Sequence, residues 1–397
     1  MATRVRSYSK VNLGLVIGPV RGDGFHGLAT CYQTLDLHDV VRVTARRAEK
    51  TKITLTTNHP FVPRDGRNTA WKMVERCLLK LDTCAEVEVY IEKNLPVQGG
   101  MGAGSANAAA ALIGLERELG LKLSGNWTEA DRLAVAAEVG SDVPLFLIGG
   151  AVLGEGRGEI VRAMPDMPVV PCVVAVPGVG VSTPAAFRDW DSLVDAGARR
   201  GDLAIQPMSQ RRDMGHPNSS PGPTWGLTSG VGMGRLEELS HAYSSVLAIA
   251  GVDEKLEASG ILRSRPSGEG QYPEKKQGLE TSGSLAENAL LALVRTGIGS
   301  DRLRGLELQE GLHNDFEDVV FPEYPSLRET KRQLMGSDSG SPALYAALSG
   351  SGSALFGLYG SVADAVAAQQ RVQATGVQAF LTETLPRREY WTRMFAG

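Results

Sequence analysis

Alternation of apolar and polar residues is the clearest pattern in the first hundred positions of this chain. Such alternation predicts half-buried strands, and it occurs in VVRVTA near residue 40, in KITLTT from residue 52 and in VEVYIEK from residue 87. A helical period instead marks RNTAWKMVERCLLKL, the stretch after Ser105, and TEADRLAVAAEVG. The last of these begins with a capping signature, Thr128 followed by Asp131, and Gly140 is its predicted end.

The second half of the chain carries a further set of predicted elements. They are a buried strand in VVPCVVAVPG from Val169, a strand in SALFGLYG, a helix in SVADAVAAQQRVQATG and a final strand in VQAFLTETL. Because strands and helices do not alternate strictly along the chain, the pattern favours an α+β layer architecture over a doubly wound sheet.

Two stretches of the second half, 206–235 and 259–284, are rich in Gly, Pro and Ser and have little apolar periodicity. Too little apolar surface is available there to offset the entropy of ordering the chain, which predicts flexible insertions. A plain surface insertion and a lid over the substrate are the two interpretations that the sequence leaves open.

Composition and charge exclude several classes of protein. The 397 residues suffice for two domains with sizeable cores, and a net charge of −4 argues against a nucleic-acid-binding face. The cysteines Cys31, Cys77, Cys84 and Cys172 lack metal-ligand spacing, which predicts free thiols and no metal site. No apolar run approaches the ~20 residues of a membrane span, and the N-terminus lacks a secretory signal. We therefore expect a cytoplasmic protein without a membrane partner.

A glycine-rich segment, GGMGAGS at 99–105, separates the strand VEVYIEK from an alanine-rich helix. Free backbone N–H groups at the positive end of a helix bind anionic phosphate, and glycine lets the backbone close around it. A tight turn packed against a neighbour is the alternative interpretation. The residues predicted to bind phosphate are Gly99, Gly100, Gly102, Gly104, Ser105 and Asn107.

Neither of the two familiar phosphate loops matches this segment. A Walker A loop ends in Gly-Lys followed by Ser or Thr, whereas this one ends in GSAN. The dinucleotide fingerprint needs a third glycine where Ser105 stands, which argues against a nicotinamide-dependent oxidoreductase.

Three segments of the chain together resemble the motifs of the GHMP kinase superfamily. They are SKVNLGL (9–15), PVQGGMGAGSANAA (96–109) and LSGSGSALFGLY (348–359), in the order typical of that superfamily. The resemblance implies an N-terminal ATP-binding domain similar to ribosomal protein S5 domain 2, over 1–165. It also implies a ferredoxin-like C-terminal domain, over 166–397, with the active site between the two domains.

The same resemblance implies the cofactors and adds residues to the site. ATP is the implied phosphoryl donor, with a divalent cation, normally Mg²⁺. Pro96 joins the residues around the phosphates, and Asn68 matches a position near the adenosine. The C-terminal glycine motif consists of Gly350, Ser351 and Gly352.

Phosphoryl transfer to an alcohol needs a group that accepts or orients the hydroxyl proton, beside a phosphate cradle and neutralising charge. Asp142, in GSDVPLF, is the candidate base, and Lys10 is its candidate partner, a pairing that the resemblance also implies. Asn12 follows Lys10 by two residues on the same strand face and fits as a hydrogen-bonding neighbour. The alternatives are that Asp142 caps a helix and that Lys10 is a solvated surface lysine.

Three further segments resemble one branch of this superfamily, which phosphorylates a CDP-linked methylerythritol in the non-mevalonate pathway to isoprenoids. They are GDGFHGLATCYQTLDLHD (22–39), GSDVPLFLIGGAVLGEGRGE (140–159) and GVGVSTPAAF (178–187). The resemblance implies that Phe25 and Phe187 stack on the cytosine and that His26 hydrogen-bonds to its edge. Aromatic stacking and fixed hydrogen-bond partners are what a flat base with an amide-like edge requires.

Two other functions stay open on the sequence alone. The first is a kinase for another alcohol, such as homoserine or mevalonate, and the second is a catalytically silent nucleotide-binding homologue. A substrate without a nucleobase would not need Phe25 and His26, and a pure nucleotide binder would not need both Lys10 and Asp142. The expected partners are a small-molecule substrate and ATP, with the protein a monomer or a homodimer.

Overall fold

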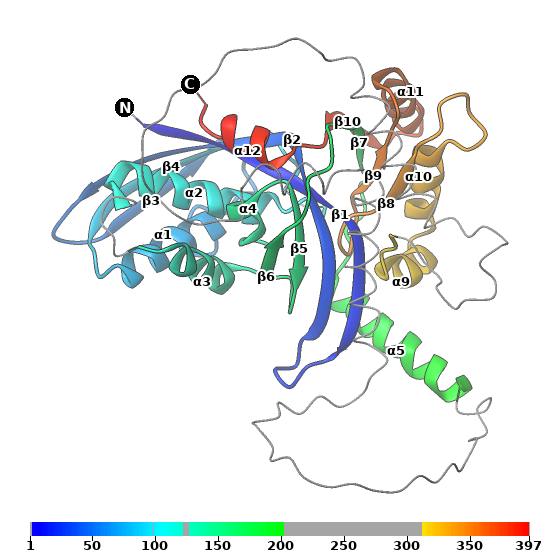
Figure 1. The fold of residues 1–397 in the computed structure, drawn as a ribbon, viewed down its shortest axis with the longest axis horizontal. Helices are drawn as coiled ribbons and strands as arrows, with labels where there is room; N and C mark the ends of the chain where they lie inside the picture. The colour runs from blue at the N-terminus through cyan, green and yellow to red at the C-terminus, as the bar shows by residue number, and fades with distance from the viewer. Residues whose placement is uncertain (1, 98, 122–126, 202–311, 397) are drawn as a thin grey trace, which may run out of the picture.

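The computed structural model describes residues 2–97, 99–121, 127–201 and 312–396. Both predicted insertions, 206–235 and 259–284, lie outside these residues. Within the described residues the chain forms two sheets with helices packed on them, in agreement with the α+β prediction (Figure 1).

The first sheet is built on a long antiparallel hairpin, drawn in blue in Figure 1. Its strands are β1 (Thr3–Val20), β2 (His26–Arg47), β3 (Lys52–Thr57), β4 (Ala85–Glu92), β5 (Ala151–Glu155) and β6 (Ile160–Ala163). One edge of β2 pairs with β1, and its other edge pairs with β5 at 30–33 and with β4 at 40–47. β3 pairs with β4, and β6 pairs with β5, so the sheet divides into two arms beyond β2.

The hairpin is much longer than the strands that alternation predicts. SKVNLGL and VVRVTA are only parts of β1 and β2. Residues 7–18 of β1 are all buried, because side chains on both faces of the strand pack inside the protein. A strand buried on both faces lacks the alternation that marks a half-buried strand, so its full length could not be read from the pattern.

Helices cover one face of the first sheet (Figure 1). They are α1 (Thr69–Lys80), α2 (Ala103–Leu119), α3 (Glu129–Val139) and the short α4 (Leu145–Ile148). Asn68 caps α1, and Thr128 and Asp131 form the predicted capping box of α3. The helices and the sheet enclose the first hydrophobic core.

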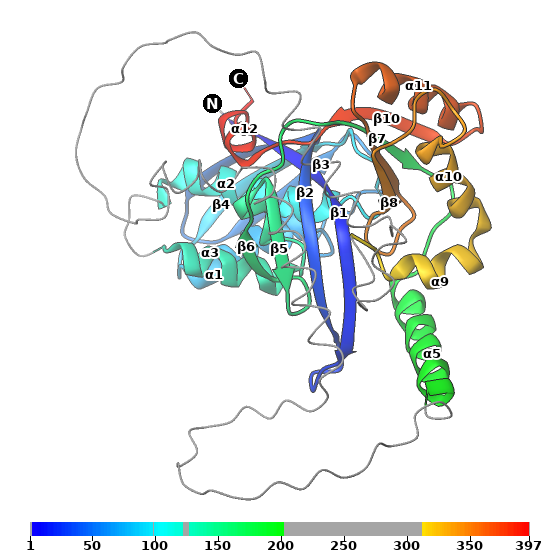
Figure 2. The same cartoon turned by 45° about the vertical axis from the view of Figure 1, so that its right-hand side comes forward.

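The second sheet is antiparallel and has the strand order β10-β7-β9-β8. Its strands are β7 (Pro171–Val176), β8 (Tyr345–Leu348), β9 (Leu355–Leu358) and β10 (Gln378–Glu383). Its helices are α5 (Thr183–Gly201), α9 (Phe316–Glu323), α10 (Pro325–Met335) and α11 (Val362–Gln373). Along the chain, helices follow β7 and β9, the first and third strands in sequence, which makes a ferredoxin-like βαββαβ unit. Figure 2 shows α9, α10 and α11 beside this sheet and α5 extending away from it.

A second hydrophobic core joins the two sheets. Leu13 of β1 lies in this core together with Phe356 of β9. After β10 the C-terminal segment returns to the first sheet through α12 (Arg387–Thr392). There the N–H of Arg6 on β1 donates to the carbonyl of Met394 at 2.8 Å. The two ends of the chain therefore lie close together (Figure 1).

The four cysteines are all free thiols. Cys31, Cys77 and Cys172 are buried, and Cys84 is exposed. Among the helices that the structure describes, none combines the length and the apolar character needed to cross a membrane.

A buried ion pair holds the chain just before the glycine-rich loop. Lys93 Nζ lies 2.7 Å from Asp39 Oδ2, and the N–H groups of Asn94 and Leu95 each donate to Asp39 Oδ1 at 2.7 Å. Burial lowers the pKa of Lys93, and the nearby carboxylate of Asp39 opposes that effect. These contacts tie the end of β4, and hence the start of the loop, to β2.

Replacing Asp39 with alanine should destabilise the protein strongly. The Asp39→Ala change leaves the buried Lys93 ammonium without its partner and the N–H groups of Asn94 and Leu95 without their acceptor, so we expect a loss of about 3–5 kcal/mol in the free energy of unfolding. Chemical denaturation of the purified protein measures this loss. Arg46→Ala is the control, because it removes an exposed ion pair with Glu86 from the same sheet and should cost under about 1 kcal/mol. Equal losses in the two variants would contradict the proposed role of Asp39.

Candidate active site

The three motifs singled out in the sequence meet at one place in the fold. The N–H of Lys10 on β1 donates to the carbonyl of Met101 at 3.1 Å. From the C-terminal motif, the N–H of Ala354 donates to the carbonyl of Gly99 at 3.1 Å, and Ser349 Oγ donates to the carbonyl of Gly100 at 3.1 Å. Backbone hydrogen bonds therefore join β1, the glycine-rich loop and the C-terminal glycine motif.

Two of the loop glycines are required by close packing. Gly100 has a φ of +78°, and a Cβ there would lie 2.3 Å from the carbonyl oxygen of Ser349. Gly102, the N-cap of α2, has a φ of +68°, and a Cβ there would lie 2.9 Å from the ring of Phe146 and 3.1 Å from Cγ of Lys10. The alternative interpretation, a tight turn against a neighbour, thus describes these two positions correctly.

Next to these two packed glycines, the first turn of α2 has features that a phosphate-binding site needs. Gly104 is exposed and Ser105 is half-buried, and both lie in the first helical turn. The N–H groups of this turn have no intrahelical acceptor and point to the positive end of the helix dipole. Thr69 Oγ1 donates to the carbonyl of Gly104 at 2.6 Å, which places the start of α1 next to this turn.

Lys10 and Asp142 face each other as predicted. Lys10 Nζ lies 3.3 Å from Asp142 Oδ2, and the two side chains are 3% and 33% exposed. Asp142 does not cap a helix, since α3 ends at Val139 and α4 has Pro144 at its N-cap without a side-chain hydrogen bond. The buried Lys10 is likewise no solvated surface lysine.

A chain of hydrogen bonds orients the Lys10 ammonium. Lys10 Nζ donates to Asn12 Oδ1 at 2.7 Å, and Asn12 Nδ2 donates to Thr30 Oγ1 at 2.8 Å. Thr30 Oγ1 in turn donates to the carbonyl of Gly14 at 2.8 Å. The amide of Asn12 is thereby fixed with its oxygen toward Lys10, as expected for the predicted hydrogen-bonding neighbour.

A cavity of about 600 Å³ lies over this ion pair. Its walls come from the β1–β2 hairpin, the loop after α3, the start of α5 and the C-terminal glycine motif. The sequence-predicted residues that line it are Lys10, Asn12, Phe25, His26, Gly100, Asp142, Phe187, Gly350 and Ser351. Residues from both ends of the chain thus contribute to one concave site, as substrate sites require.

The aromatic end of the cavity differs in detail from the predicted base sandwich. His26 and Phe187 stack on each other, with ring centroids 5.0 Å apart and planes inclined by 8°. His26 Nδ1 donates to the carbonyl of Gly18 at 2.9 Å, and its Nε2 lies 3.1 Å from Asp191 Oδ1. Phe25 is 55% exposed. Both ring nitrogens of His26 therefore already have partners. A hydrogen bond from His26 to a cytosine stays a prediction, and it requires one ring nitrogen to give up its present partner.

Two other predicted ligands have structural roles in the fold. Asn107 is buried on α2, and its Oδ1 accepts from Ser7 Oγ at 2.7 Å. Asn68 accepts from the N–H of Ala70 at 2.9 Å and donates to the carbonyl of Pro63 at 2.8 Å. Neither side chain lines the cavity. Contact of either residue with ATP therefore stays a prediction, as it does for Pro96, which precedes the loop.

The C-terminal glycine motif connects the Lys10–Asp142 pair to α5. A Cβ at Gly350 would lie 3.5 Å from Asn12 Oδ1 and 3.9 Å from Lys10 Nζ. Ser351 Oγ is hydrogen-bonded to Thr183 Oγ1 at 2.7 Å. Gly352, with a φ of +93°, turns the chain over Leu348.

Sequence reasoning missed three residues of the site. Asn314, which is 1% exposed, donates to the carbonyls of Leu348 and Gly350 at 2.8 Å each and so holds the glycine motif. Tyr32 donates to Asp142, and Arg157 lies at the wall of the cavity. Asn314 had a local signal, the polar group His-Asn-Asp before an apolar helix, whereas Tyr32 and Arg157 lie inside the segments 22–39 and 140–159 but were not singled out within them.

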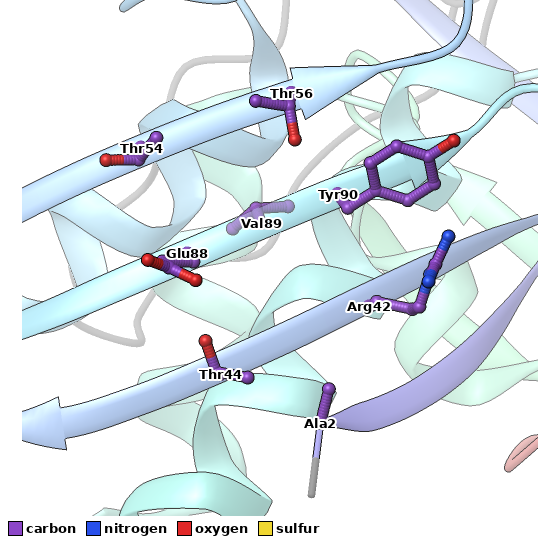
Figure 3. A pocket seen from close by; sticks show the side chains of 8 residues that line it. All are labelled: Ala2, Arg42, Thr44, Thr54, Thr56, Glu88, Val89 and Tyr90. Carbon is purple, nitrogen blue, oxygen red and sulfur yellow. The ribbon is translucent and has the colours of Figure 1, made fainter.

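The outer face of the first sheet carries a separate, shallow hollow (Figure 3). Arg42 of β2 lies over the ring of Tyr90 on β4 at 4.2 Å, while Thr56 of β3 is paired with Tyr90 and Thr54 with Glu88. None of the sequence-predicted site residues lines this hollow. Across the described part of the chain, no group of three or more His, Cys, Asp or Glu side chains is arranged to hold a metal ion.

Comparison with known proteins gives the class to which this fold and site belong. The family described as "GHMP kinases N terminal domain" matches residues 68–150, and "GHMP kinases C terminal" matches residues 291–378. A crystal structure of 4-(cytidine 5'-diphospho)-2C-methyl-D-erythritol kinase has a TM-score of 0.55 at 23% identity and covers 96% of this chain and 99% of its own. Homoserine kinase from Cytophaga hutchinsonii has a TM-score of 0.54 at 18% identity, covering 97% and 95%. These likenesses show the GHMP kinase fold.

Curated relatives narrow the class. The 4-diphosphocytidyl-2-C-methyl-D-erythritol kinase of Nocardia farcinica is 40% identical over 54% of this chain and 68% of its own. The enzymes of the same name from Nocardioides and Rhodococcus jostii are 34% and 42% identical, over 67% and 48% of this chain and 85% and 59% of theirs. The chain therefore belongs to the GHMP kinases, within the family of the 4-diphosphocytidyl-2-C-methyl-D-erythritol kinases. Membership of a kinase family implies ATP and a small-molecule acceptor as its ligands.

Gly100→Ala should disrupt the contact between the two glycine motifs. A side chain at Gly100 meets the Ser349 carbonyl and also strains a left-handed backbone, so we expect a loss of about 2–5 kcal/mol in the free energy of unfolding, with loss of activity. Gly340→Ala is the matched control, because no atom lies within 4 Å of its added Cβ. Denaturation curves of both variants test this. A Gly100→Ala protein as stable as the control would contradict the packing role.

Proposed function

We propose that this protein transfers the γ-phosphoryl group of ATP to a hydroxyl of 4-diphosphocytidyl-2-C-methyl-D-erythritol, giving the 2-phosphate, in the non-mevalonate pathway to isoprenoids. The observation that carries this proposal is the Lys10–Asp142 pair, which lines the cavity beside the N-terminus of α2. The names of the curated relatives support the choice of substrate.

Asp142 and Lys10 divide the chemistry between them. The Asp142 carboxylate accepts or orients the proton of the attacking hydroxyl, and weak assistance suffices because phosphoryl transfer has a loose transition state. The Lys10 ammonium steadies the carboxylate and attracts the negative charge that develops on the reacting oxygens. Asn12 keeps that ammonium in place through its 2.7 Å hydrogen bond.

The N-terminus of α2 is the proposed cradle for the phosphates of ATP. The free N–H groups of its first turn and the dipole of α2 favour an anion there. Gly104 lies in this turn and Gly99, Gly100 and Gly102 lie just before it, and none of them carries a side chain that would block an anion. Mg²⁺ would arrive with the nucleotide and neutralise phosphate charge, and the half-buried Ser105 hydroxyl in this turn is a candidate ligand for it.

The position of Arg157 supports the proposal that the substrate carries a diphosphate between its base and its alcohol. Its guanidinium lies 5.1 Å over the ring of Phe25, at the aromatic end of the cavity. A Cβ at the next residue, Gly158, would lie 3.9 Å from Asp142 Oδ1, so the backbone at this point is close to the reacting pair. Arg157 Nε lies 3.7 Å from Glu159 Oε1, which leaves the terminal nitrogens for an anion. Neither homoserine nor mevalonate carries a diphosphate.

The two alternatives have less support. A kinase for homoserine or mevalonate would share the fold, as the TM-scores of 0.54 and 0.53 for two such enzymes indicate, but it would not need aromatic residues and Arg157 in the cavity. A catalytically silent homologue would have no use for the intact hydrogen-bond chain around Lys10. The domain boundary at 165/166, a cytoplasmic location and a monomeric or homodimeric state stay predictions.

A coupled ADP-release assay with Mg²⁺ and ATP tests the proposed function. Turnover should occur with 4-diphosphocytidyl-2-C-methyl-D-erythritol and not with free methylerythritol, homoserine or mevalonate. Asp142→Asn should lower kcat by about 100-fold, the lower end of the usual contribution of a positioned acid–base group, since the loose transition state needs only weak assistance. Asp364→Asn, which lies on α11 outside the cavity, is the control and should leave kcat unchanged. Turnover of homoserine or mevalonate instead would support a kinase activity but contradict the proposed substrate.

Arg157→Ala should raise KM for the CDP-linked substrate by about 10- to 100-fold, because hydrogen bonds to charged groups contribute roughly 1.5–3 kcal/mol. kcat should change little, since Arg157 does not face the transferred group. The control is Arg162→Ala, an exposed arginine of β6 that pairs with Glu155 outside the cavity. Steady-state kinetics on both variants decide the matter. An unchanged KM in Arg157→Ala would contradict the proposal that Arg157 binds the diphosphate.

A further inference from the structure

We propose that Tyr32 is a positioning residue for phosphoryl transfer, whose hydroxyl holds the Asp142 carboxylate in its reactive orientation. The proposal rests on the proposed function, because it assumes that Asp142 serves the attacking hydroxyl. It adds to the reacting pair a third group, contributed by β2.

Among the residues that the structure describes, the hydroxyl of Tyr32 has one hydrogen-bond partner, the carboxylate of Asp142. Tyr32 OH donates to Asp142 Oδ1 at 2.9 Å, from the middle of β2 to the loop after α3. The side chain is 2% exposed although it borders the cavity. Asn12 stands directly opposite Tyr32 in the β1–β2 register, so both neighbours of the reacting pair come from one step of the hairpin.

Two glycines hold the Tyr32 ring in place. A Cβ at Gly154 would lie 2.5 Å from Cε2 of the ring, and a Cβ at Gly158 would lie 2.6 Å from the hydroxyl oxygen. The backbones of β5 and of the turn after it therefore pack directly on the ring, without intervening side chains. A ring confined in this way aims its hydroxyl at a fixed point, which is what orienting a carboxylate requires.

The two oxygens of Asp142 have different partners. Oδ1 accepts from the neutral Tyr32 hydroxyl, and Oδ2 lies 3.3 Å from the Lys10 ammonium. The terminal torsion of an aspartate is soft, so the carboxylate turns easily when one contact is removed. Without the Tyr32 hydroxyl the ammonium would attract both oxygens, and the lone pairs facing the cavity would no longer be held for the substrate.

Tyr32 stays a donor throughout the working pH range. Burial raises the pKa of Tyr32 well above its ordinary value, and the negative charge of Asp142 raises it further. The phenol therefore keeps its proton and does not compete with the substrate hydroxyl as an acid.

A purely structural tyrosine looks different in this protein. Tyr359 is equally buried, and its hydroxyl donates to the backbone carbonyl of Leu334 at 2.9 Å, outside the cavity. Tyr390 likewise donates to the carbonyl of Phe146. Tyr32 instead donates to a side chain that is one-third exposed to the cavity, where a bond made only for stability would not be expected.

The test uses Tyr32→Phe, with Tyr359→Phe as the matched control, in the full-length protein. Each change removes one buried hydroxyl, so the two variants should lose similar stability. Tyr32→Phe should lower kcat by about 10- to 100-fold, the equivalent of one hydrogen bond to a charged group, with KM for ATP and for the alcohol unchanged. Tyr359→Phe should keep both kcat and KM.

A double-mutant cycle links the effect to Asp142. If Tyr32 acts through the carboxylate, Tyr32→Phe added to Asp142→Ala should not lower the residual turnover further. A kcat of Tyr32→Phe within about twofold of wild type, or an equal loss in the Asp142→Ala background, would overturn the inference. Wild-type turnover by Asp142→Ala itself would instead reject Asp142 as the reacting group, and the inference with it.

Discussion

Close contact between the backbones of residues 99–102 and 349–354 is the constraint on which this site depends. Gly100 and Ser349 approach so closely that no side chain fits between them, and the N–H of Ala354 donates to the carbonyl of Gly99. The segments come from both sheets, so the cavity forms only where the sheets are held together. The hydrophobic core shared by β1, β7 and β9 holds the two sheets together. Because this interior is tightly packed, a small displacement of one sheet is transmitted to the other instead of being absorbed.

The sequence predicted the parts of the site that recur as motifs and missed those that depend on long-range contact. The α+β class, the capping box at Thr128 and the facing of Lys10 and Asp142 could be predicted, because each has a local pattern or a recognisable segment. The full length of β1 could not, since burial on both faces removes alternation. The bond of Asn314 to the glycine motif could not either, because it joins residues 36 positions apart with no periodic signal.

At the aromatic end of the cavity, the sequence predicted which residues gather there but not how their rings are arranged. Phe25, His26 and Phe187 were expected near one another, and all three line the cavity. Which ring stacks on which is decided by α5, whose Asp191 faces His26 and brings that ring onto Phe187. Stacking energies differ little between partners, so a neighbouring carboxylate is enough to select the pair.

The two flanks of residues 202–311 are both attached to the C-terminal glycine motif. On one side Thr183, at the start of α5, bonds to Ser351, and on the other Asn314 bonds to Gly350. The cavity wall is therefore closed by its own contacts, whatever the length of chain between them. The position of the glycine motif is thus set by side chains from two segments of the chain that lie far apart in the sequence.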